Sequence, residues 1–282
     1  MLALTMMVGT VAAAEQCGNT TTQCPSATQC CTQQWSPTTF GCAIPGATRC
    51  CKPGVENPPS TTLPNCLIIG DSVSIGYTGV VQKALDGVCQ VQHGPWDIHD
   101  GGAEDTAYGL SCLSNWLVTQ AQQPVKWDVI QFNFGLHDLS SNLTSQETYR
   151  QQLTQIADAL IQTGAKLQYG LTTPFMPQSS NGTMVVERLN ALAWLEMRKR
   201  SIPIINLYNT ITDHCGAVYE YCDWCRTDPG RCSYHYKAPG YEALGTVVAA
   251  AFKARLQERW KDDASPQQFL PQAAHEDSLF MA

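Results

Sequence analysis

Residues 65–262 alternate between short apolar runs and longer segments with helical periodicity. The first run contains Leu67, Ile68 and Ile69 in succession, a pattern typical of a parallel strand that is covered on both faces. Strands that are separated by helices imply a parallel sheet with helices packed on each side. The sequence therefore predicts an α/β fold, specifically a three-layer α/β/α sandwich.

The expected elements follow in regular order along this domain. Strands are predicted at residues 65–69, 89–93, 127–134, 166–173 and 202–207, and helices near 75–85, 107–120, 146–163, 185–200 and 239–260. Residues 263–282 are polar and lack a periodic apolar face, so we expect a tail without a fixed structure.

The N-terminus has the features of an exported chain. Residues 1–14 are apolar and end in small residues, as in a signal peptide, although a basic start is missing. The run is shorter than the ~20 residues of a spanning helix, so we expect no stable membrane insertion. Three N-x-T triplets offer glycosylation sites at Asn19, Asn142 and Asn181. We therefore expect a secreted, extracellular glycoprotein.

Cysteines dominate residues 15–52. The spacing is C-x6-C-P-x4-C-C-x10-C-x7-C-C, with Gly, Pro, Thr, Ser and Gln between the cysteines. Such a segment has too few apolar residues for a core and depends on disulfides, and no C-x2-C pair here suggests a metal site. The pattern resembles the front half of a granulin or another knottin-type module, with one cysteine at position 42 where granulins have two. A Pro/Thr/Ser-rich linker is predicted at 53–64.

All 14 cysteines are candidates for disulfides, because an even number in an exported chain favours pairing. They are Cys17, Cys24, Cys30, Cys31, Cys42, Cys50, Cys51, Cys66, Cys89, Cys112, Cys215, Cys222, Cys225 and Cys232. We expect Cys66 as a partner for the N-terminal module, a bridge between Cys89 and Cys112, and two bridges among the last four. The Cys222-x2-Cys225 spacing could also mark a redox or zinc site, but the exported context favours disulfides.

Gly70-Asp71-Ser72 ends the first apolar run, and a helical pattern follows it. Gly70 permits a tight turn, and Ser72 is then expected at the carboxyl end of the strand, where open α/β sheets bind ligands. Free N–H groups at the start of the helix could stabilise an oxyanion there. Ser72 could instead serve only as a helix cap.

A serine nucleophile needs a base, and His235 is the best candidate because it lies just before the last predicted helix. With G-D-S near the front of the domain and this histidine near its end, residues 65–260 resemble the SGNH (GDSL) hydrolase family. The resemblance implies a flavodoxin-like strand order and ester hydrolysis with Ser72 as nucleophile and His235 as base.

Two further blocks carry the resemblance. In H-D-G-G-A-E-D-T, at residues 99–106, the family role of an oxyanion-hole glycine falls on Gly102, with Gly101 as the second choice. In F-N-F-G-L-H-D, at residues 132–138, the family has an asparagine where this chain has His137. Neutral imidazole can donate one N–H, and Asn133 is an alternative donor.

The family usually has an aspartate three residues before the histidine, and here that position is Cys232. Either His235 works in a Ser–His dyad, or Asp228 or Asp223 folds back to orient it. Trp96 and Trp224 are predicted to lie in loops near the site and to contact substrate.

The net charge of −7 and the absence of clustered Lys and Arg argue against nucleic-acid binding. No metal or organic cofactor is implied. We expect a secreted esterase that acts on acyl or acetyl esters of small molecules, glycans or lipids. The alternative is a catalytically inactive extracellular binding protein on the same scaffold.

Overall fold

The structure is a computed structural model that describes residues 51–95, 101–174, 182–216, 222–227 and 232–257, and the backbone of four short strands before residue 44. Its main sheet has five parallel strands in the order β6-β5-β7-β8-β9. The strands are β5 (Asn65–Ile69), β6 (Gln90–Gly94), β7 (Val129–Phe132), β8 (Lys166–Gly170) and β9 (Ile204–Ile205). This is the predicted flavodoxin-like order.

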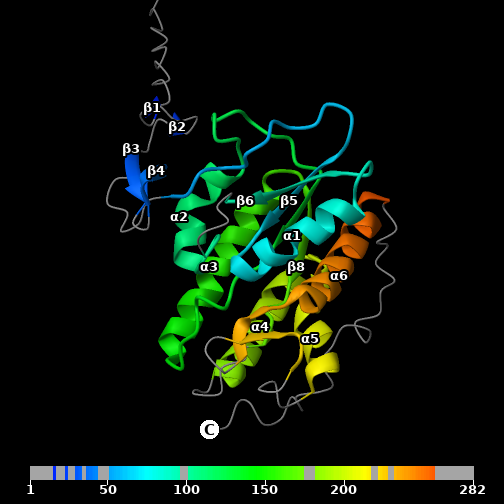
Figure 1. The fold of residues 1–282 in the computed structure, drawn as a ribbon. Coiled ribbons are helices and arrows are strands. Elements are labelled where there is room, and N and C mark those ends of the chain that lie inside the picture. The colour runs from blue at the N-terminus through cyan, green and yellow to red at the C-terminus, as the bar shows by residue number, and fades with distance from the viewer. Residues whose placement is uncertain are drawn as a thin grey trace, which may run out of the picture.

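Helices cover both faces of the sheet, as the fold prediction required (Figure 1). The helices are α1 (Ser72–Ala84), α2 (Thr106–Trp116), α3 (Leu143–Ile161), α4 (Gly182–Lys199), α5 (Leu207–Cys215) and α6 (Ala238–Leu256). One face packs against α2, α3 and α4, and the other packs against α1, α5 and α6. The three-layer α/β/α sandwich is thereby confirmed.

Alternation along the strands divides the core into two layers. In β5, Leu67 and Ile69 point to the side of α2 and α3, whereas Cys66 and Ile68 point to the side of α1 and α6. All four side chains are fully buried. A strand that is covered on both faces excludes water from every residue, which explains the uninterrupted apolar run in the sequence.

Two elements near the C-terminus were not predicted. Helix α5 follows β9 directly and is capped by Asn206, whose side chain accepts a hydrogen bond from the Asn209 N–H. Strands β10 (Cys225–Thr227) and β11 (Cys232–Tyr236) form an antiparallel pair outside the main sheet. Cysteines and polar residues obscure the pattern of the hairpin. Helix α5 does carry a helical spacing, with buried Leu207 and Ile211 four residues apart, but its nine residues are few for recognising a periodic pattern.

The stretch predicted as a linker contacts the α/β domain. Val55 is fully buried, and its backbone exchanges hydrogen bonds with Val118 and Gln120. Gly54 lies against the end of α2 and the residues after it, since an added Cβ would come within 2.6 Å of the Asn115 carbonyl oxygen and 2.1 Å of the Val118 carbonyl oxygen. The packed domain therefore extends back to Cys51, ahead of the predicted start at residue 65.

Three disulfides join described cysteines: Cys51–Cys112, Cys66–Cys89 and Cys215–Cys222. Two expectations were wrong, because Cys89 pairs with Cys66 instead of Cys112, and Cys66 is therefore no partner for the N-terminal module. Spacing alone cannot reveal that β5 and β6 are neighbours or that residue 51 lies against α2. Cys225 is also disulfide-bonded, in agreement with the prediction for the last group.

Four short strands are described before residue 44: β1 (Glu15–Gln16), β2 (Gln23–Cys24), β3 (Gln29–Gln33) and β4 (Ser36–Ala43). They form two antiparallel pairs, β1 with β2 and β3 with β4. The predicted signal peptide and the tail after residue 262 lie outside the described residues. Among the helices that the structure describes, none is long and apolar enough to cross a membrane.

Helices α1 and α6 approach each other closely through glycines. An added Cβ on Gly245 would lie 2.6 Å from Val80 Cβ, and one on Gly76 would lie 2.2 Å from the Tyr241 ring. Because Ser72 begins α1 and His235 lies just before α6, this contact controls how the two residues meet.

We predict that Gly245→Ala lowers the free energy of unfolding by about 1–3 kcal/mol, because overpacking outweighs the better helix propensity of alanine. Urea denaturation would measure the change. The matched control is Gly79→Ala in α1, where an added Cβ meets nothing within 4 Å. The free energy of unfolding of Gly79→Ala should be unchanged or higher by up to ~1 kcal/mol. Equal stabilities for the two variants would contradict the close-packing explanation.

Candidate active site

Strand β5 leads directly to Ser72. After Ile69, the turn at Gly70 leaves little room, since an added Cβ would lie 2.8 Å from Ser74 Oγ. Asp71 then caps α1 by accepting a hydrogen bond from the Val73 N–H at 2.9 Å. The cap is therefore provided by Asp71, and Ser72 becomes the first residue of the helix with a partly exposed side chain.

His235 reaches Ser72 from the hairpin that the sequence did not predict. Its Nε2 lies 2.8 Å from Ser72 Oγ, although the two residues are 163 positions apart. Strand β11 holds the ring there, and a backbone hydrogen bond of 2.7 Å from the Lys237 N–H to the Trp224 carbonyl fixes the end of the strand. Serine hydroxyl and imidazole thus lie within proton-transfer distance.

The pKa of His235 is lowered from its usual 6.5. Burial is the largest cause, and nearby Arg226 and His137 act in the same direction, while the Asp71 carboxylate opposes them. Arg226 is exposed and lies on the strand paired with β11. A lowered pKa keeps the imidazole neutral, and therefore able to accept a proton, at mildly acidic pH.

Gly102 lies directly beside the turn that precedes Ser72. It forms an antiparallel bridge with Asp71, and the next residue donates from Ala103 N to Gly70 O at 2.8 Å. Its φ of +67° and an approach of 2.4 Å between an added Cβ and Gly70 O exclude other residues. The expected oxyanion-hole glycine is therefore next to the serine turn.

His137 is exposed and packs over Gly101, where an added Cβ would lie 3.1 Å from His137 Cε1. The adjacent Asp138 accepts hydrogen bonds from the N–H and the hydroxyl of Thr106, at 2.9 and 2.5 Å. Burial raises the pKa of Asp138 to about 6. These bonds attach the His137 loop to the start of α2, which follows the Gly101–Gly102 loop.

Asn133 does not fit the alternative role of oxyanion donor. It is buried, and its amide nitrogen donates to Gly170 O at 2.7 Å and to Thr172 Oγ1 at 3.2 Å. Both amide hydrogens are used inside the domain. His137 is left as the side-chain candidate, and Asn133 ties β7 to the end of β8.

The carboxylate that would orient His235 is not the predicted Asp223. That side chain is 79% exposed and binds His214, with 2.7 Å between Asp223 Oδ1 and His214 Nε2. Asp228 and the side chain of Cys232 lie outside the described residues. Within the described residues, the buried Asp71 carboxylate raises the pKa of His235, a role that the sequence analysis did not assign to it. The sequence feature that could have indicated this role is the position of Asp71 directly before Ser72.

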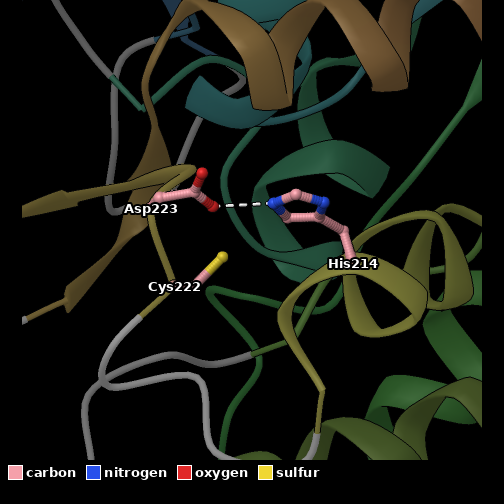
Figure 2. Close-up of side chains that lie close together, drawn as sticks. All are labelled: His214, Cys222 and Asp223. Atoms are coloured by element: carbon pink, nitrogen blue, oxygen red, sulfur yellow. Dashed lines mark hydrogen bonds and ion pairs between the residues drawn. The ribbon is translucent and has the colours of Figure 1, made fainter.

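His214, Cys222 and Asp223 lie together, as Figure 2 shows, and resemble a set of metal ligands. Cys222 is bonded to Cys215, however, so it offers no thiolate. The His214 ring also stacks on Trp224, with 3.6 Å between the ring centroids. This group is better explained as a structural support for the hairpin that carries His235.

A second serine–histidine pair lies beneath the site. Ser74 Oγ is 2.6 Å from His93 Nε2, and His93 Nδ1 is 2.9 Å from the Pro95 carbonyl oxygen. Since a carbonyl only accepts, Nδ1 carries the hydrogen and Nε2 faces the hydroxyl. Burial lowers the pKa of His93 to about 4. The pair is fully buried and joins the first turn of α1 to the end of β6.

The remaining candidates are placed as follows. Trp224, expected at the substrate, is partly buried and has one face covered by His214. Asn142 is exposed and caps α3, and its glycosylation stays a prediction. Trp96, Asn19 and Asn181 lie outside the described residues.

Comparison of the structure with solved structures finds the same fold in several hydrolases. A lipase/acylhydrolase from Enterococcus faecalis has a TM-score of 0.52 at 17% identity, over 68% of this chain and 96% of that one. A carbohydrate esterase family 3 protein from Talaromyces cellulolyticus has a TM-score of 0.52 at 13% identity, over 69% and 99%. An acetyl xylan esterase, AlAXEase, has a TM-score of 0.51 at 13% identity, over 66% and 98%.

No protein-family model and no curated protein sequence matches this chain. At these identities the similarity shows the fold, which is the α/β fold of SGNH hydrolases. The structural neighbours support the resemblance that the sequence blocks indicated.

We predict that the His235 imidazole titrates below pH 6.5 in the native protein, because burial and Arg226 disfavour its cation. NMR titration of the histidine side chains would measure this pKa. Arg226→Gln should raise it, since the variant removes a neighbouring positive charge. Arg188→Gln, a change of another exposed arginine in α4, is the control and should leave it unchanged. A His235 pKa at or above 6.5 in the wild type would contradict this account. So would equal His235 pKa values in Arg226→Gln and Arg188→Gln.

Proposed function

We propose that the protein is a secreted serine esterase that hydrolyses acyl or acetyl carboxylic esters through a covalent acyl-enzyme. The observation that carries the proposal is the 2.8 Å contact between Ser72 Oγ and His235 Nε2 at the carboxyl edge of a parallel sheet. The fold shared with acylhydrolases and esterases supports ester hydrolysis as the reaction class.

In the first half of the reaction, Ser72 Oγ attacks the ester carbonyl carbon while His235 Nε2 takes the hydroxyl proton. The tetrahedral intermediate collapses, the bond to the alcohol breaks, and His235 returns the proton to the leaving oxygen. In the second half, His235 removes a proton from water as the water oxygen attacks the acyl carbon. The bond to Ser72 Oγ then breaks, His235 returns the proton to that oxygen, and the carboxylic acid leaves with both residues restored. Only neutral His235 can start this sequence, so its lowered pKa favours the base form.

The negative oxygen of the intermediate needs hydrogen-bond donors. The backbone N–H groups of Ser72 and Gly102 and the His137 ring are the proposed oxyanion hole. Their arrangement around the serine turn supports this role, since Gly102 bridges to Asp71 and His137 packs over Gly101. His235 is oriented either within a Ser–His dyad, with buried Asp71 stabilising its cation, or by Asp228.

The proposed substrates are esters on carbohydrates or lipids. Structural neighbours that include an acetyl xylan esterase and a lipase/acylhydrolase favour this range. The three disulfides between described cysteines and the apolar first 14 residues support secretion, because disulfides persist in oxidising compartments.

We predict that a fluorophosphonate probe labels the protein at Ser72, because the probe reacts with an activated serine and requires no natural substrate. Mass spectrometry would locate the label. Ser72→Ala should remove both labelling and hydrolysis of a short-chain p-nitrophenyl ester. Ser111→Ala, at an α2 hydroxyl bonded only to its own helix among the described contacts, is the control. A folded protein that is neither labelled nor active would favour the binding-protein alternative.

For the oxyanion hole, we predict that His137→Ala lowers kcat by about 10²-fold, the typical cost of one lost donor. His137→Asn returns an amide donor and should recover part of that loss. Steady-state kinetics on the same ester would test both variants. Wild-type kcat in His137→Ala would remove His137 from the oxyanion hole.

A further inference from the structure

A lysine from outside the sequence blocks of the site lies buried behind it. Lys52 is 1% exposed, and its ammonium donates to the Gly102 carbonyl at 2.7 Å and to Glu104 Oε1 at 2.8 Å. A buried ammonium costs several kcal/mol unless its hydrogen bonds are made, so these contacts are needed for Lys52 to remain there. The cation is therefore bound directly to the loop at residues 101–104, which we call the oxyanion loop.

The backbone of Lys52 is fixed independently of its side chain. Its N–H donates to the Tyr108 hydroxyl at 2.8 Å, and its carbonyl accepts from Asn115 Nδ2 at 2.7 Å. The preceding residue, Cys51, is bonded to Cys112. All three partners belong to α2, so Lys52 is attached to the helix that follows the oxyanion loop.

Lys52 completes the fixation of one peptide group in the loop. The peptide between Gly102 and Ala103 donates through Ala103 N to Gly70 O, and its carbonyl accepts from Lys52. With both polar groups bound, this peptide cannot rotate without breaking a hydrogen bond. Gly102 has a positive φ, and glycine can adopt a wide range of backbone angles. The two hydrogen bonds restrict the backbone angles that Gly102 adopts. The Gly102 N–H belongs to the preceding peptide, which is joined to this one through the Gly102 Cα. Fixing the Gly102–Ala103 peptide therefore limits how far the Gly102 N–H can turn.

We propose that Lys52 is a positioning residue that holds the Gly102 N–H in place for the oxyanion of the ester reaction. This inference rests on the proposed esterase function. It assigns a part in catalysis to a residue that precedes the sequence resemblance, in the segment next to the cysteine-rich stretch. The positive charge of Lys52 also acts on the surroundings of the site, since it contributes to the lowered pKa of His93.

Lys52→Met keeps the length and apolar body of the side chain and removes its donor. We expect kcat on a p-nitrophenyl ester to fall at least ~10-fold, since a shift of about 1 Å in a positioned group can cost ~10²-fold. KM should stay within about twofold, because the contact matters in the transition state. The affinity for a trifluoromethyl ketone, which forms a tetrahedral oxyanion on the serine, should fall by about the same factor as kcat/KM.

The matched control is Lys166→Met. Lys166 also donates from a partly buried ammonium to a backbone carbonyl, that of Arg255 at 3.0 Å, but it lies at the start of β8. This variant should keep kcat within about twofold of the wild type, whatever it does to stability. If only Lys52→Met loses kcat, the loss comes from the candidate site and not from a general decrease in the stability of the protein.

A second pair of variants covers the case in which Lys52→Met does not fold, since that change leaves the Glu104 carboxylate without its cation. Lys52→Met combined with Glu104→Gln removes both charges and should lose kcat as the single lysine variant does. Glu104→Gln alone keeps the Lys52–Gly102 bond and is the reference for the double variant, whose kcat should be at least ~10-fold lower than that of Glu104→Gln. If both lysine variants failed to fold, Lys52 would be a folding residue and the proposal would be wrong.

The experiments distinguish a failure of the Lys52 proposal from a failure of the esterase proposal. An active wild type together with a folded Lys52→Met variant of unchanged kcat, or with a loss confined to KM, would overturn the role of Lys52 alone. A wild type that neither hydrolyses esters nor reacts with the fluorophosphonate would overturn the esterase proposal, and the role of Lys52 with it.

Discussion

The close packing of α1 against α6 is the contact on which the candidate site depends. Ser72 is the first residue of α1, and His235 lies on the strand that runs into α6. Glycines at positions 76 and 245 let the two helices approach until side chains of one meet the backbone of the other. Two residues distant in the chain can share a proton only if these helices keep that spacing, so a packing requirement in the core becomes a geometric requirement of the chemistry.

The sequence predicted the parallel sheet well because buried parallel strands carry a strong signal. The apolar run at Leu67–Ile69 and the periodicity of helices such as α3 depend on local burial, which the residue types record directly. Strand order came from the resemblance, and the structure agrees with it.

The predictions that failed concern contacts between distant residues. Cys89 was assigned to Cys112, although its partner Cys66 lies on the neighbouring strand, and such adjacency is decided by topology. Asn133 looked like a donor because it is near His137 in the chain, yet it follows the end of β7 and its amide is bonded inside the domain to Gly170 O. The hairpin of β10 and β11 was missed because cysteines replace the periodic apolar residues that mark a strand.

The charged groups around the candidate site shift one another's pKa values in opposite directions. The carboxylate of Asp71 is buried, its pKa is raised by that burial, and both His137 and His235 counteract the rise. Arg226 and Asp71 act on the His235 pKa with opposite signs. Position 232 holds a cysteine where the SGNH family usually has an aspartate, and these neighbouring charges contribute to the pKa of His235.

The attachment of residues 51–55 to α2 has a consequence for the boundaries of the folded unit. A chain shortened to begin at residue 65, where the family resemblance starts, would leave Cys112 as a free thiol and would open the space that Val55 and Lys52 occupy. Water would then reach the apolar side of α2 next to the candidate site. The packed α/β domain therefore includes Cys51, the last cysteine of the N-terminal series, so the two regions of the chain share a residue at their border.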